Sequence, residues 1–496
     1  MIAGMSRASL SSRREFLSAA AAPAILRGGL RRVQQPNILV IMSDEHNHRV
    51  AGFAGNRLAR TPNLDRLAAT GVTFGNCYTN SPLCVPSRLV FTSGKYIHRT
   101  GAWSNSCELP RPDYPSLPAI LSRAGYESFL CGKQHYAASR RYGFTEIGNM
   151  NLGRKDGRNT RRAADDAASN RTGVRQRIAG IAVAENSSVM SHDRDVSARV
   201  VDFLAKRESS GRPFFLFAGF LAPHFPLTVP RNYLDHFRGK VGMPNLPPGL
   251  VERLPLNYHH LRRGFGLEEF DDATTLRGRE HYYAHTEWMD SQVGQVLDAL
   301  SRSPAARDTI VIYTTDHGEN MGEHGLWWKN CLFEHAAHIP LIVNWPERWK
   351  GGTHRGGVCS MVDVVQTIAN LGRAPAPEDW NGHSLVGVLD DAKARWKDMA
   401  VSQYYAHNIA SGFAMIRQDK WKYIYHSAPD TAHPAVRELY DLAADPDELH
   451  DLAGAPRHGR RIAEMHNALV KELGEHPGET ESRCRAETSR GYAQPL

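Results

Sequence analysis

Four runs of apolar residues along the chain have the pattern of strands that are buried on both faces of a sheet. Each run is continuous and rich in Ile, Val, Leu or Phe, without the alternation of apolar and polar residues that a half-exposed strand shows. The runs predict strands at residues 37–42, 213–218, 309–314 and 339–343.

A helix is predicted between the first two runs. Thr61 can cap it, Pro62 suits its first position, and Leu64, Leu67 and Ala68 line one side. Strands that alternate with helices predict an α/β fold, with a mostly parallel sheet between helices. In such sheets ligands bind beyond the carboxyl ends of the strands.

Two stretches depart from this pattern and indicate a division of the chain. Residues 153–189 are rich in Arg, Ala, Asn, Ser and Gly with little periodicity, which is typical of a surface insertion or lid. Later, aromatic-rich strand signals at 421–425 and a turn signal at 445–447 appear. We therefore predict a catalytic domain over 36–390 and a smaller C-terminal α+β subdomain over 395–496.

The first 33 residues have the pattern of a signal peptide. Arg13-Arg14 precede a run of small apolar residues at 18–26, which is typical of the twin-arginine export route. A disordered, arginine-rich tail is the alternative interpretation. No later stretch reaches the roughly 18 uninterrupted apolar residues of a membrane span. We expect a periplasmic or extracellular protein without a membrane span.

Composition and charge exclude several classes of protein. Apolar residues make up 41% of the 496 residues and aromatic residues 9%, which excludes global disorder. The net charge of +8 is mild and scattered, so we expect no nucleic-acid partner, although some attraction for an anionic substrate remains open. The seven cysteines show neither zinc spacing nor a disulfide framework.

Acidic residues follow two of the predicted strands. Asp44 comes after the first strand, and Asp316-His317 come after the third. Because strand ends of a parallel sheet open on the same side, these groups can converge on one hard cation such as Ca²⁺, Mg²⁺ or Mn²⁺. Each of these residues alone would more often be a helix cap or a turn residue, and the two strand-end positions together favour the metal.

One cysteine is distinguished by its neighbours. Pro86 suits the first turn of a helix and therefore places Cys84 at a helix amino terminus. Free N–H groups and the helix dipole make that end a ready oxyanion site. Arg88, one turn further along, and Lys95 add positive charge. A buried, inert thiol is the alternative for a lone cysteine.

The segment C-V-P-S-R that starts at Cys84 resembles the signature of type I sulfatases in the alkaline-phosphatase superfamily. Other segments resemble motifs of this family in the same order, at 37–44, 62–68, 132–135, 222–226, 315–319, 322–329 and 438–448. The resemblance covers about residues 36–455 and implies an alkaline-phosphatase-like fold.

Two departures from many arylsulfatases qualify this resemblance. Glu45 follows Asp44 where a second aspartate is common, and His317 follows Asp316 where asparagine is common. The Asp-His pair is similar to the choline-sulfatase and phosphonate-monoester-hydrolase branch.

The resemblance implies that a formylglycine-generating maturation enzyme oxidises Cys84. The hydrated formylglycine then attacks the sulfur of a sulfate ester, and the bound sulfate is expelled as the aldehyde re-forms. One divalent cation is implied beside it, Ca²⁺ ahead of Mn²⁺ or Mg²⁺, with Asp44, Asp316, His317 and residue 84 as ligands. Glu45 is left outside this set.

The resemblance also implies roles for the charged residues around the nucleophile. His135 is the candidate base for sulfate release, and His224 with Lys329 would protonate the leaving oxygen. Of the 24 histidines, these two and His317 are singled out by the motifs that contain them, and the others, His324 included, are interpreted as structural or solvent-exposed. Positive charge for the transition state is implied at Arg88, Lys95, Lys133 and Lys329.

The substrate is the least constrained part of the prediction. Asn105 and Trp328 are candidate substrate contacts, and the polar, arginine-rich segments expected to form the pocket walls favour a hydrophilic ester such as a sulfated carbohydrate. Choline sulfate would need an aromatic cage, for which Trp103, Trp327 and Trp328 are the candidates. A phosphonate monoester or phosphodiester hydrolase and an inactive glycan-binding relative are the other hypotheses. Nothing in the sequence sets the oligomeric state.

Overall fold

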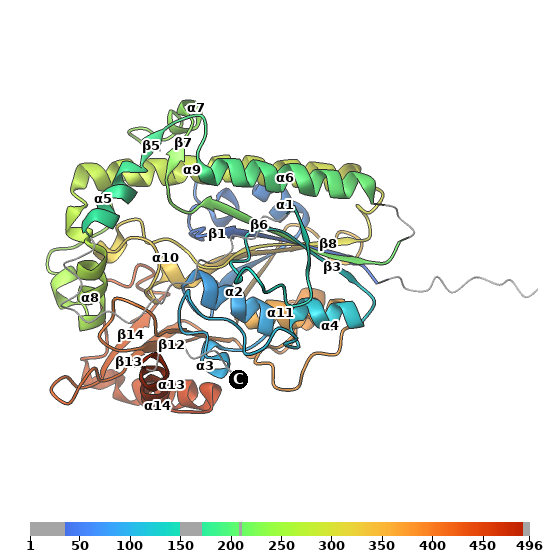
Figure 1. Cartoon of the computed structure of the whole chain (residues 1–496). Coiled ribbons are helices and arrows are strands. Elements are labelled where there is room, and N and C mark those ends of the chain that lie inside the picture. Colours follow the sequence, from blue (N-terminus) through green and yellow to red (C-terminus); the bar gives the residue numbers. More distant parts are fainter. Residues whose placement is uncertain (1–34, 149–170, 208–210, 490–496) are drawn as a thin grey trace, which may run out of the picture. The chain divides into compact units, whose positions relative to one another are not determined.

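A large sheet forms the centre of residues 35–496, which make one compact unit. The computed structural model describes residues 35–148, 171–207 and 211–489, so the predicted signal peptide at 1–33 lies outside the described residues. The strand order is β10-β2-β9-β8-β1-β6-β3-β4 (Figure 1). The bounds are β1 Asn37–Asp44, β2 Val72–Tyr78, β3 Glu127–Gly132, β4 Thr145–Ile147, β6 Phe214–Pro223, β8 Thr309–Thr315, β9 His338–Asn344 and β10 Thr353–Ser360.

The four predicted buried strands are confirmed as β1, β6, β8 and β9. Nearly every residue of these strands is buried, as their continuous apolar sequences require. All pairings in the sheet are parallel except those of β9, which runs antiparallel to β2 and β8. The predicted α/β class with a mostly parallel sheet is therefore confirmed.

Side chains of β1 alternate between two hydrophobic layers. Ile38, Val40 and Met42 pack into the layer under α2, α4 and α11, whereas Leu39 and Ile41 pack into the layer under α1, α6 and α9. The two sets of helices lie on opposite sides of the sheet (Figure 1). Their bounds are α1 Pro62–Thr70, α2 Cys84–Ser93, α4 Leu117–Arg123, α6 Ser188–Lys206, α9 Asp272–Arg302 and α11 Met361–Leu371.

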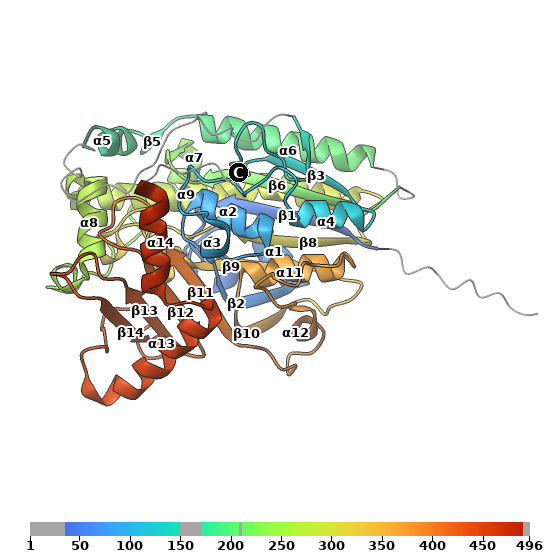
Figure 2. The same cartoon turned by 60° about the horizontal axis from the view of Figure 1, so that its bottom comes forward.

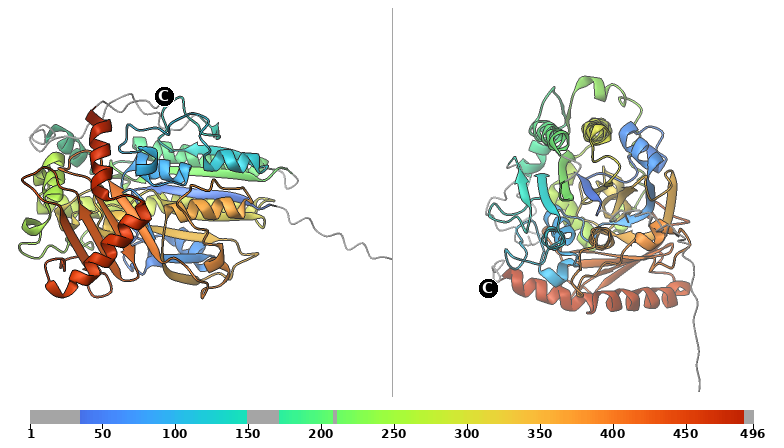
Figure 3. Two further views of the ribbon diagram at one scale, coloured as in Figure 1. Left: turned by 90° about the horizontal axis from the view of Figure 1, so that it is seen from below. Right: turned by 90° about the vertical axis from the view of Figure 1, so that its right-hand side faces the viewer.

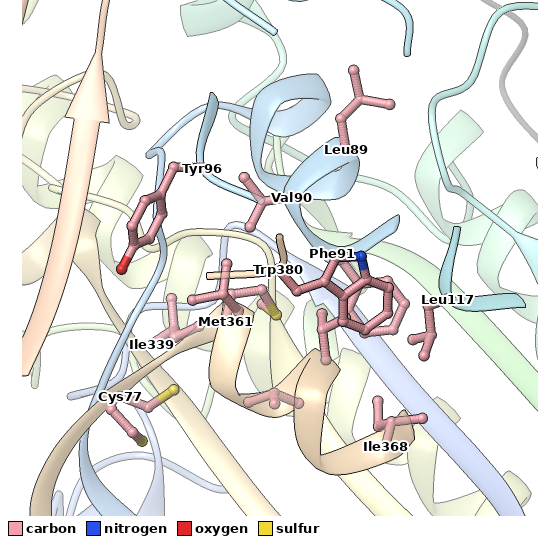
Figure 4. Packing of buried hydrophobic residues seen from close by; sticks show 14 of the residues in the cluster. Cys77, Leu89, Val90, Phe91, Tyr96, Leu117, Ile339, Met361, Ile368 and Trp380 are labelled. Carbon is pink, nitrogen blue, oxygen red and sulfur yellow. The ribbon is translucent and has the colours of Figure 1, made fainter. Parts of the chain in front are cut away.

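The helix that carries Cys84 is held by apolar contacts on its far side. Val90 and Phe91 of α2 belong to the same buried cluster as Met361 and Ile368 of α11 (Figure 4). Burying such side chains stabilises the fold by about 1.5–3 kcal/mol each. The orientation of α2 is thereby fixed relative to the sheet.

The predicted start of α1 is confirmed, but the predicted cap is wrong. Thr61 precedes the helix and Pro62 is its first residue. The Thr61 hydroxyl accepts a hydrogen bond from the N–H of Gly52 and donates one to Asp65 instead of capping the helix.

A second, antiparallel sheet lies in the C-terminal part of the chain (Figure 2). Its order is β11-β12-β13-β14. Both faces of β12 are buried, because Ala414 and Ile416 join one apolar cluster while Phe413 and Met415 join another. The bounds are β11 Met399–Tyr404, β12 Phe413–Gln418, β13 Trp421–His426, β14 Val436–Asp441, α13 Gly459–Leu473 and α14 Pro477–Ser489.

The helices α13 and α14 lie along the outer side of this second sheet (Figure 3). Because the cluster that contains Ile416 also contains Val40 of β1, the two sheets share one core. The boundary predicted between 390 and 395 stays a prediction.

The described part of the predicted insertion 153–189 holds more structure than its composition indicated. It contains α5 and β5 and leads into α6, whereas 153–170 lie outside the described residues. The remaining α-helices and strands are α3 Ile97–Thr100, α5 Arg171–Ala179, β5 Ala182–Val183, β7 Thr228–Val229, α7 Arg231–Leu234, α8 Leu256–Phe265, α10 Glu334–Ala337 and α12 Val386–Asp390. None of the described helices has the length and apolar character that a membrane crossing requires.

Candidate active site

Four neighbouring parallel strands end at one edge of the central sheet, and each delivers a polar side chain there. Asp44 is the last residue of β1, and Asp316 directly follows β8. His224 directly follows β6, and Lys133 directly follows β3. The expected meeting of strand ends therefore occurs, with Asp44, Asp316 and Lys133 buried and His224 half-buried.

Two glycines allow β3 and β6 to approach closely where Lys133 leaves the sheet. The Lys133 N–H donates to the Gly219 carbonyl at 2.9 Å. A Cβ atom on Gly132 would lie 2.1 Å from that carbonyl oxygen, and one on Gly219 would lie 2.1 Å from the Lys133 carbonyl oxygen. Gly132 also has a φ of +91°, which side chains disfavour. Close packing of the two strands therefore explains why glycine precedes Lys133.

The amino terminus of α2 points Cys84 at the ends of β1 and β8. Cys84 is the first residue of α2, as predicted. Asn105 accepts a hydrogen bond from the N–H of Val85 at 3.0 Å, which satisfies one of the free N–H groups of the first turn. The Ser87 hydroxyl donates to the carbonyl of Asp316 at 2.7 Å, so the helix is tied to the end of β8.

Arg88 joins the two strand-end carboxylates. Its guanidinium donates to Asp44 and to Asp316, each at 2.9 Å, and to the carbonyl of Lys133 at 2.7 Å. All three side chains in these ion pairs are fully buried. Breaking such a pair costs about 3–5 kcal/mol. Arg88 therefore holds the carboxylates in place from beneath the site.

The donor atoms predicted to bind a cation converge. Four residues each offer one ligand atom, and these atoms lie within 4.8 Å of one another: Asp44, Cys84, Asp316 and His317. The Sγ atom of Cys84 lies 3.3 Å from Nε2 of His317 and 4.0 Å from Oδ1 of Asp44. Carboxylate oxygens with one imidazole suit a divalent cation. The residues present therefore fit the implied metal.

Glu45, which the sequence prediction left out of the metal-ligand set, lies among the charged residues of the site. Its Oε2 atom is 3.2 Å from the ammonium of Lys329 and 3.3 Å from Nε2 of His224. Its Oε1 atom is buried and has no hydrogen-bond partner among the described residues. Burial raises the pKa of Glu45 to about 7, although Lys329 and His224 oppose the rise.

Positive charge dominates around the side chain of residue 84. Burial would raise the pKa of the Cys84 thiol, but Lys133, Lys329 and His317 outweigh it and hold the pKa well below its usual range. Burial would likewise raise the pKa of Asp44, yet Lys133 and neighbouring cations keep it low. An anion that forms at position 84 is therefore stabilised.

A cavity of about 400 Å³ opens beside Cys84. The structure brings five of the predicted residues together in its lining: Cys84, Lys133, His135, His224 and Lys329. The two candidate substrate contacts, Asn105 and Trp328, line it as well. The other two candidate tryptophans do not, because Trp103 donates to Glu487 and Trp327 stacks on Phe270.

The structure does not bring Lys95 to this cavity. Its ammonium pairs with Asp379 and lies 5.7 Å from the ring centre of Tyr114. The reason is the geometry of α2, whose ten residues separate Lys95 from Cys84 by about 15 Å. Charge in the neighbourhood of the motif was therefore a misleading signal.

Two further lining residues were missed from the sequence. Arg177 of α5 lies over the ring of Trp328 at 4.3 Å, and His407 comes from the C-terminal part of the chain. Both lie in segments expected to form the pocket walls, but no motif or periodicity distinguished them from neighbouring polar residues.

A second group of metal-binding side chains, His48, Glu334 and His338, also lies within 4.8 Å. Here the carboxylate already accepts hydrogen bonds from Lys422 at 3.0 Å and from Tyr78 at 3.0 Å. The two imidazoles stack face to face at 3.7 Å with an interplanar angle of 17°. The in-plane lone pairs of two stacked rings point in parallel and do not converge on one ion, so the group around Asp44 is the better candidate for a cation site.

The sequence profile of the sulfatase family matches residues 36–373. The chain belongs to the sulfatase family. A second profile, described as N-sulphoglucosamine sulphohydrolase, C-terminal, matches residues 322–475 of this sulfatase. The family makes the chain a sulfuric ester hydrolase and confirms the resemblance drawn from the Cys84 motif.

Relatives of this sulfatase differ in their names. Arylsulfatase K of Canis lupus familiaris is 30% identical over 465 residues, which cover 88% of this chain and 83% of that one. Choline-sulfatase of Rhizobium meliloti (strain 1021) is 32% identical over 449 residues, which cover 85% of this chain and 83% of that one. These relatives share the family with this chain, but their different names do not identify the ester that this chain cleaves.

Solved structures share the fold of this sulfatase. A protein in complex with its substrate D-glucosamine-2-N,6-O-disulfate has a TM-score of 0.70 at 22% identity and covers 90% of this chain and 100% of its own. Phosphonate monoester hydrolase of Agrobacterium radiobacter has a TM-score of 0.74 at 20% identity, and the match covers 88% of this chain and 95% of that one. These similarities show the alkaline-phosphatase-like fold.

Proposed function

We propose that this sulfatase hydrolyses a carbohydrate-type sulfate ester. The nucleophile is a formylglycine made from Cys84, and it acts together with one divalent cation, for which Ca²⁺ is the first candidate. The observation that carries the proposal is the convergence of Cys84 with Asp44, Asp316 and His317 at the ends of two adjacent strands. A maturation enzyme that recognises the Cys84 motif is the implied partner.

Two groups that the chain acquires would supply the reactive chemistry. Hydrated formylglycine supplies a hydroxyl that can attack sulfur and a second hydroxyl whose deprotonation regenerates the aldehyde. The cation supplies positive charge that favours ionisation of the attacking hydroxyl and offsets the charge on sulfate oxygens. Asp44, Asp316 and His317 would hold the cation, with residue 84 beside it.

The side chains that line the cavity are suited to moving protons and holding anionic oxygens. His135 is hydrogen-bonded to residue 84, and burial lowers its pKa, so it is suited to accept a proton there. Lys133 and Lys329 supply fixed positive charge for the sulfate oxygens.

His224 is suited to protonate the departing alcohol. Its Nδ1–H donates to the carbonyl of Phe225 at 2.7 Å, which fixes the ring. Its Nε2 atom then faces Lys329 at 3.0 Å and lines the cavity. Because Nδ1 already carries a proton, Nε2 accepts a hydrogen bond from the Lys329 ammonium, so a proton can pass from Lys329 through Nε2 to the departing oxygen.

Turnover measurements test the proposed substrate class. The panel is a set of sulfated monosaccharides, choline sulfate, an aryl sulfate and a phosphonate monoester, compared by kcat/KM on the matured enzyme. A preference for sugar sulfates supports the proposal. A preference for the phosphonate monoester or for choline sulfate would replace it with the corresponding activity on the same scaffold.

We also propose that the sulfatase is exported to the periplasm or beyond it by the twin-arginine route. The support is the sequence pattern around Arg13-Arg14 and the run of small apolar residues behind it. Because this route carries folded proteins, conversion of Cys84 can precede export.

A further inference from the structure

One cation of the cavity wall is not paired with a carboxylate among the residues that the structure describes. Arg177 lines the cavity, and its guanidinium forms neither a hydrogen bond nor an ion pair with the residues that the structure describes. The other two cations of the wall are paired, Lys133 with Asp44 and Lys329 with Glu45.

The aromatic surface of the cavity is already covered by this cation. The guanidinium carbon of Arg177 lies 4.3 Å from the ring centre of Trp328. Phe225 and Phe265 meet the same ring edge-on at 5.8 and 5.3 Å. A quaternary ammonium group would have to displace a like charge to reach the face of Trp328. This arrangement disfavours choline as the alcohol part of the substrate.

The lining of the cavity favours an anion instead. The described lining residues include Lys133, Arg177 and Lys329, and none of those described is acidic. A guanidinium presents parallel N–H groups that match the two oxygens of a carboxylate or of a sulfate. The contact of Arg177 with the ring of Trp328 restricts its side chain, which reduces the freedom lost on binding.

We propose that Arg177 forms a subsite for a second anionic group of the substrate, a carboxylate or a further sulfate, next to the sulfate that is cleaved. The inference rests on the proposed function and makes it more specific: the substrate is a sugar sulfate with two negative groups. Arg177 then acts on substrate choice, while Lys133, Lys329 and residue 84 act on the ester.

Matched substrates and a matched variant test the subsite. The probes are a sulfated uronic acid against the neutral sulfated sugar of the same linkage, and a disulfated against a monosulfated sugar. Arg177→Gln removes the charge, and Arg177→Lys keeps it without the paired N–H groups. Arg175→Gln is the control, because Arg175 belongs to the same helix but does not line the cavity and pairs with Glu269 at 3.1 Å.

The subsite predicts a change in selectivity. The ratio of kcat/KM for the dianionic over the singly charged sugar should fall about tenfold to a hundredfold in Arg177→Gln, the usual effect of losing a charged hydrogen-bonded pair. The ratio for Arg177→Lys should lie between those of the wild type and Arg177→Gln, and Arg175→Gln should keep the wild-type ratio. The substrate pair that responds identifies the group as carboxylate or sulfate.

Three results would overturn the subsite. They are an unchanged ratio in Arg177→Gln, an equal loss on both members of each pair, and an equal fall of the ratio in Arg175→Gln. An equal loss on both members would place Arg177 on the cleaved sulfate. Wild-type enzyme that cleaves no sugar sulfate would instead refute the proposed function itself, so the two failures are distinct.

Discussion

The Sγ atom of Cys84 lies 3.3 Å from Nε2 of His317, although 233 positions separate the two residues in the sequence. The contact joins the amino terminus of α2 to the carboxyl end of β8. It places the Cys84 thiol, whose pKa is held well below its usual range, against two carboxylates and an imidazole. A side chain oxidised at this position would lie against the predicted cation ligands without movement of the backbone.

Conversion of Cys84 to formylglycine is the first expected outcome. Enzyme produced with a competent maturation enzyme should yield a Cys84 peptide lighter by about 18 Da, because an aldehyde replaces the thiol. Peptide mass spectrometry measures this, and the peptides of the other six cysteines are internal controls. Cys84→Ala should lose turnover while its thermal unfolding stays near that of the wild type. Fully active enzyme with an unmodified thiol would refute the assignment.

Removal of one cation ligand should remove the metal. Asp316→Asn loses a negative charge from the cluster with Asp44 and His317, so elemental analysis should show less than one cation per chain. Asp290→Asn is the control, since Asp290 is also buried but accepts from the N–H groups of Asn63 and Leu64. Chelation should abolish activity, and added Ca²⁺ should restore it. If Asp316→Asn kept as much bound metal as Asp290→Asn, the proposed ligand set would be wrong.

Much of the fold could be predicted because its central strands are buried on both faces. Such strands must be continuous apolar runs, and β1, β6, β8 and β9 all follow this rule. The direction of a strand leaves no comparable mark. The antiparallel course of β9 depends on pairings between residues far apart in the sequence, so it was not predicted.

The candidate site was predicted where motifs coincide with strand ends and missed where side chains arrive from elsewhere. Asp44 and Asp316 meet because β1 and β8 are neighbours. Lys95 was misplaced because sequence proximity to Cys84 says nothing about the length of the helix between them. Arg177 was missed because its position depends on how α5 packs over Trp328, which composition does not encode.

Loss of His224 should slow esters with poor leaving groups most. A sugar alkoxide needs a proton as it departs, whereas the anion of an acidic phenol does not. His224→Asn should therefore lower kcat/KM for a sugar sulfate by about 10²- to 10⁴-fold, with a smaller loss on an aryl sulfate. His236→Asn is the surface control, since His236 pairs with Glu287 outside the cavity. Equal losses on both esters would remove His224 from the role of proton donor.

Export should depend on the first arginine pair and not on the second. Replacing Arg13 and Arg14 with lysine keeps the charge but removes the guanidinium pair that the twin-arginine route requires. Cell fractionation should then find the enzyme retained in the cytoplasm. The same replacement at Arg31 and Arg32 is the control and should leave export normal. Normal export of the first variant would indicate another route.

Acid should destabilise the folded enzyme partly through His324. Its Nε2–H donates to the carbonyl of Glu448 at 3.1 Å, and its ring stacks on Phe333 at 3.7 Å. Its Nδ1 atom is buried without a partner among the described residues. Burial therefore lowers the pKa of His324 from 6.5 to about 4, and the folded state holds the neutral ring.

The direction of the pH effect follows from this lowered pKa. Above pH 6.5 neither state of His324 binds a proton. Between pH 6.5 and 4 the unfolded chain binds one and the folded chain does not. The free energy of unfolding should thus fall by about 3 kcal/mol over this range on account of His324. In His324→Gln, urea unfolding at pH 7 and at pH 4.5 should show a smaller fall than in wild type. The exposed His433→Gln variant should show the wild-type fall, and a matching fall in His324→Gln would mean that the ring is already protonated in the folded enzyme.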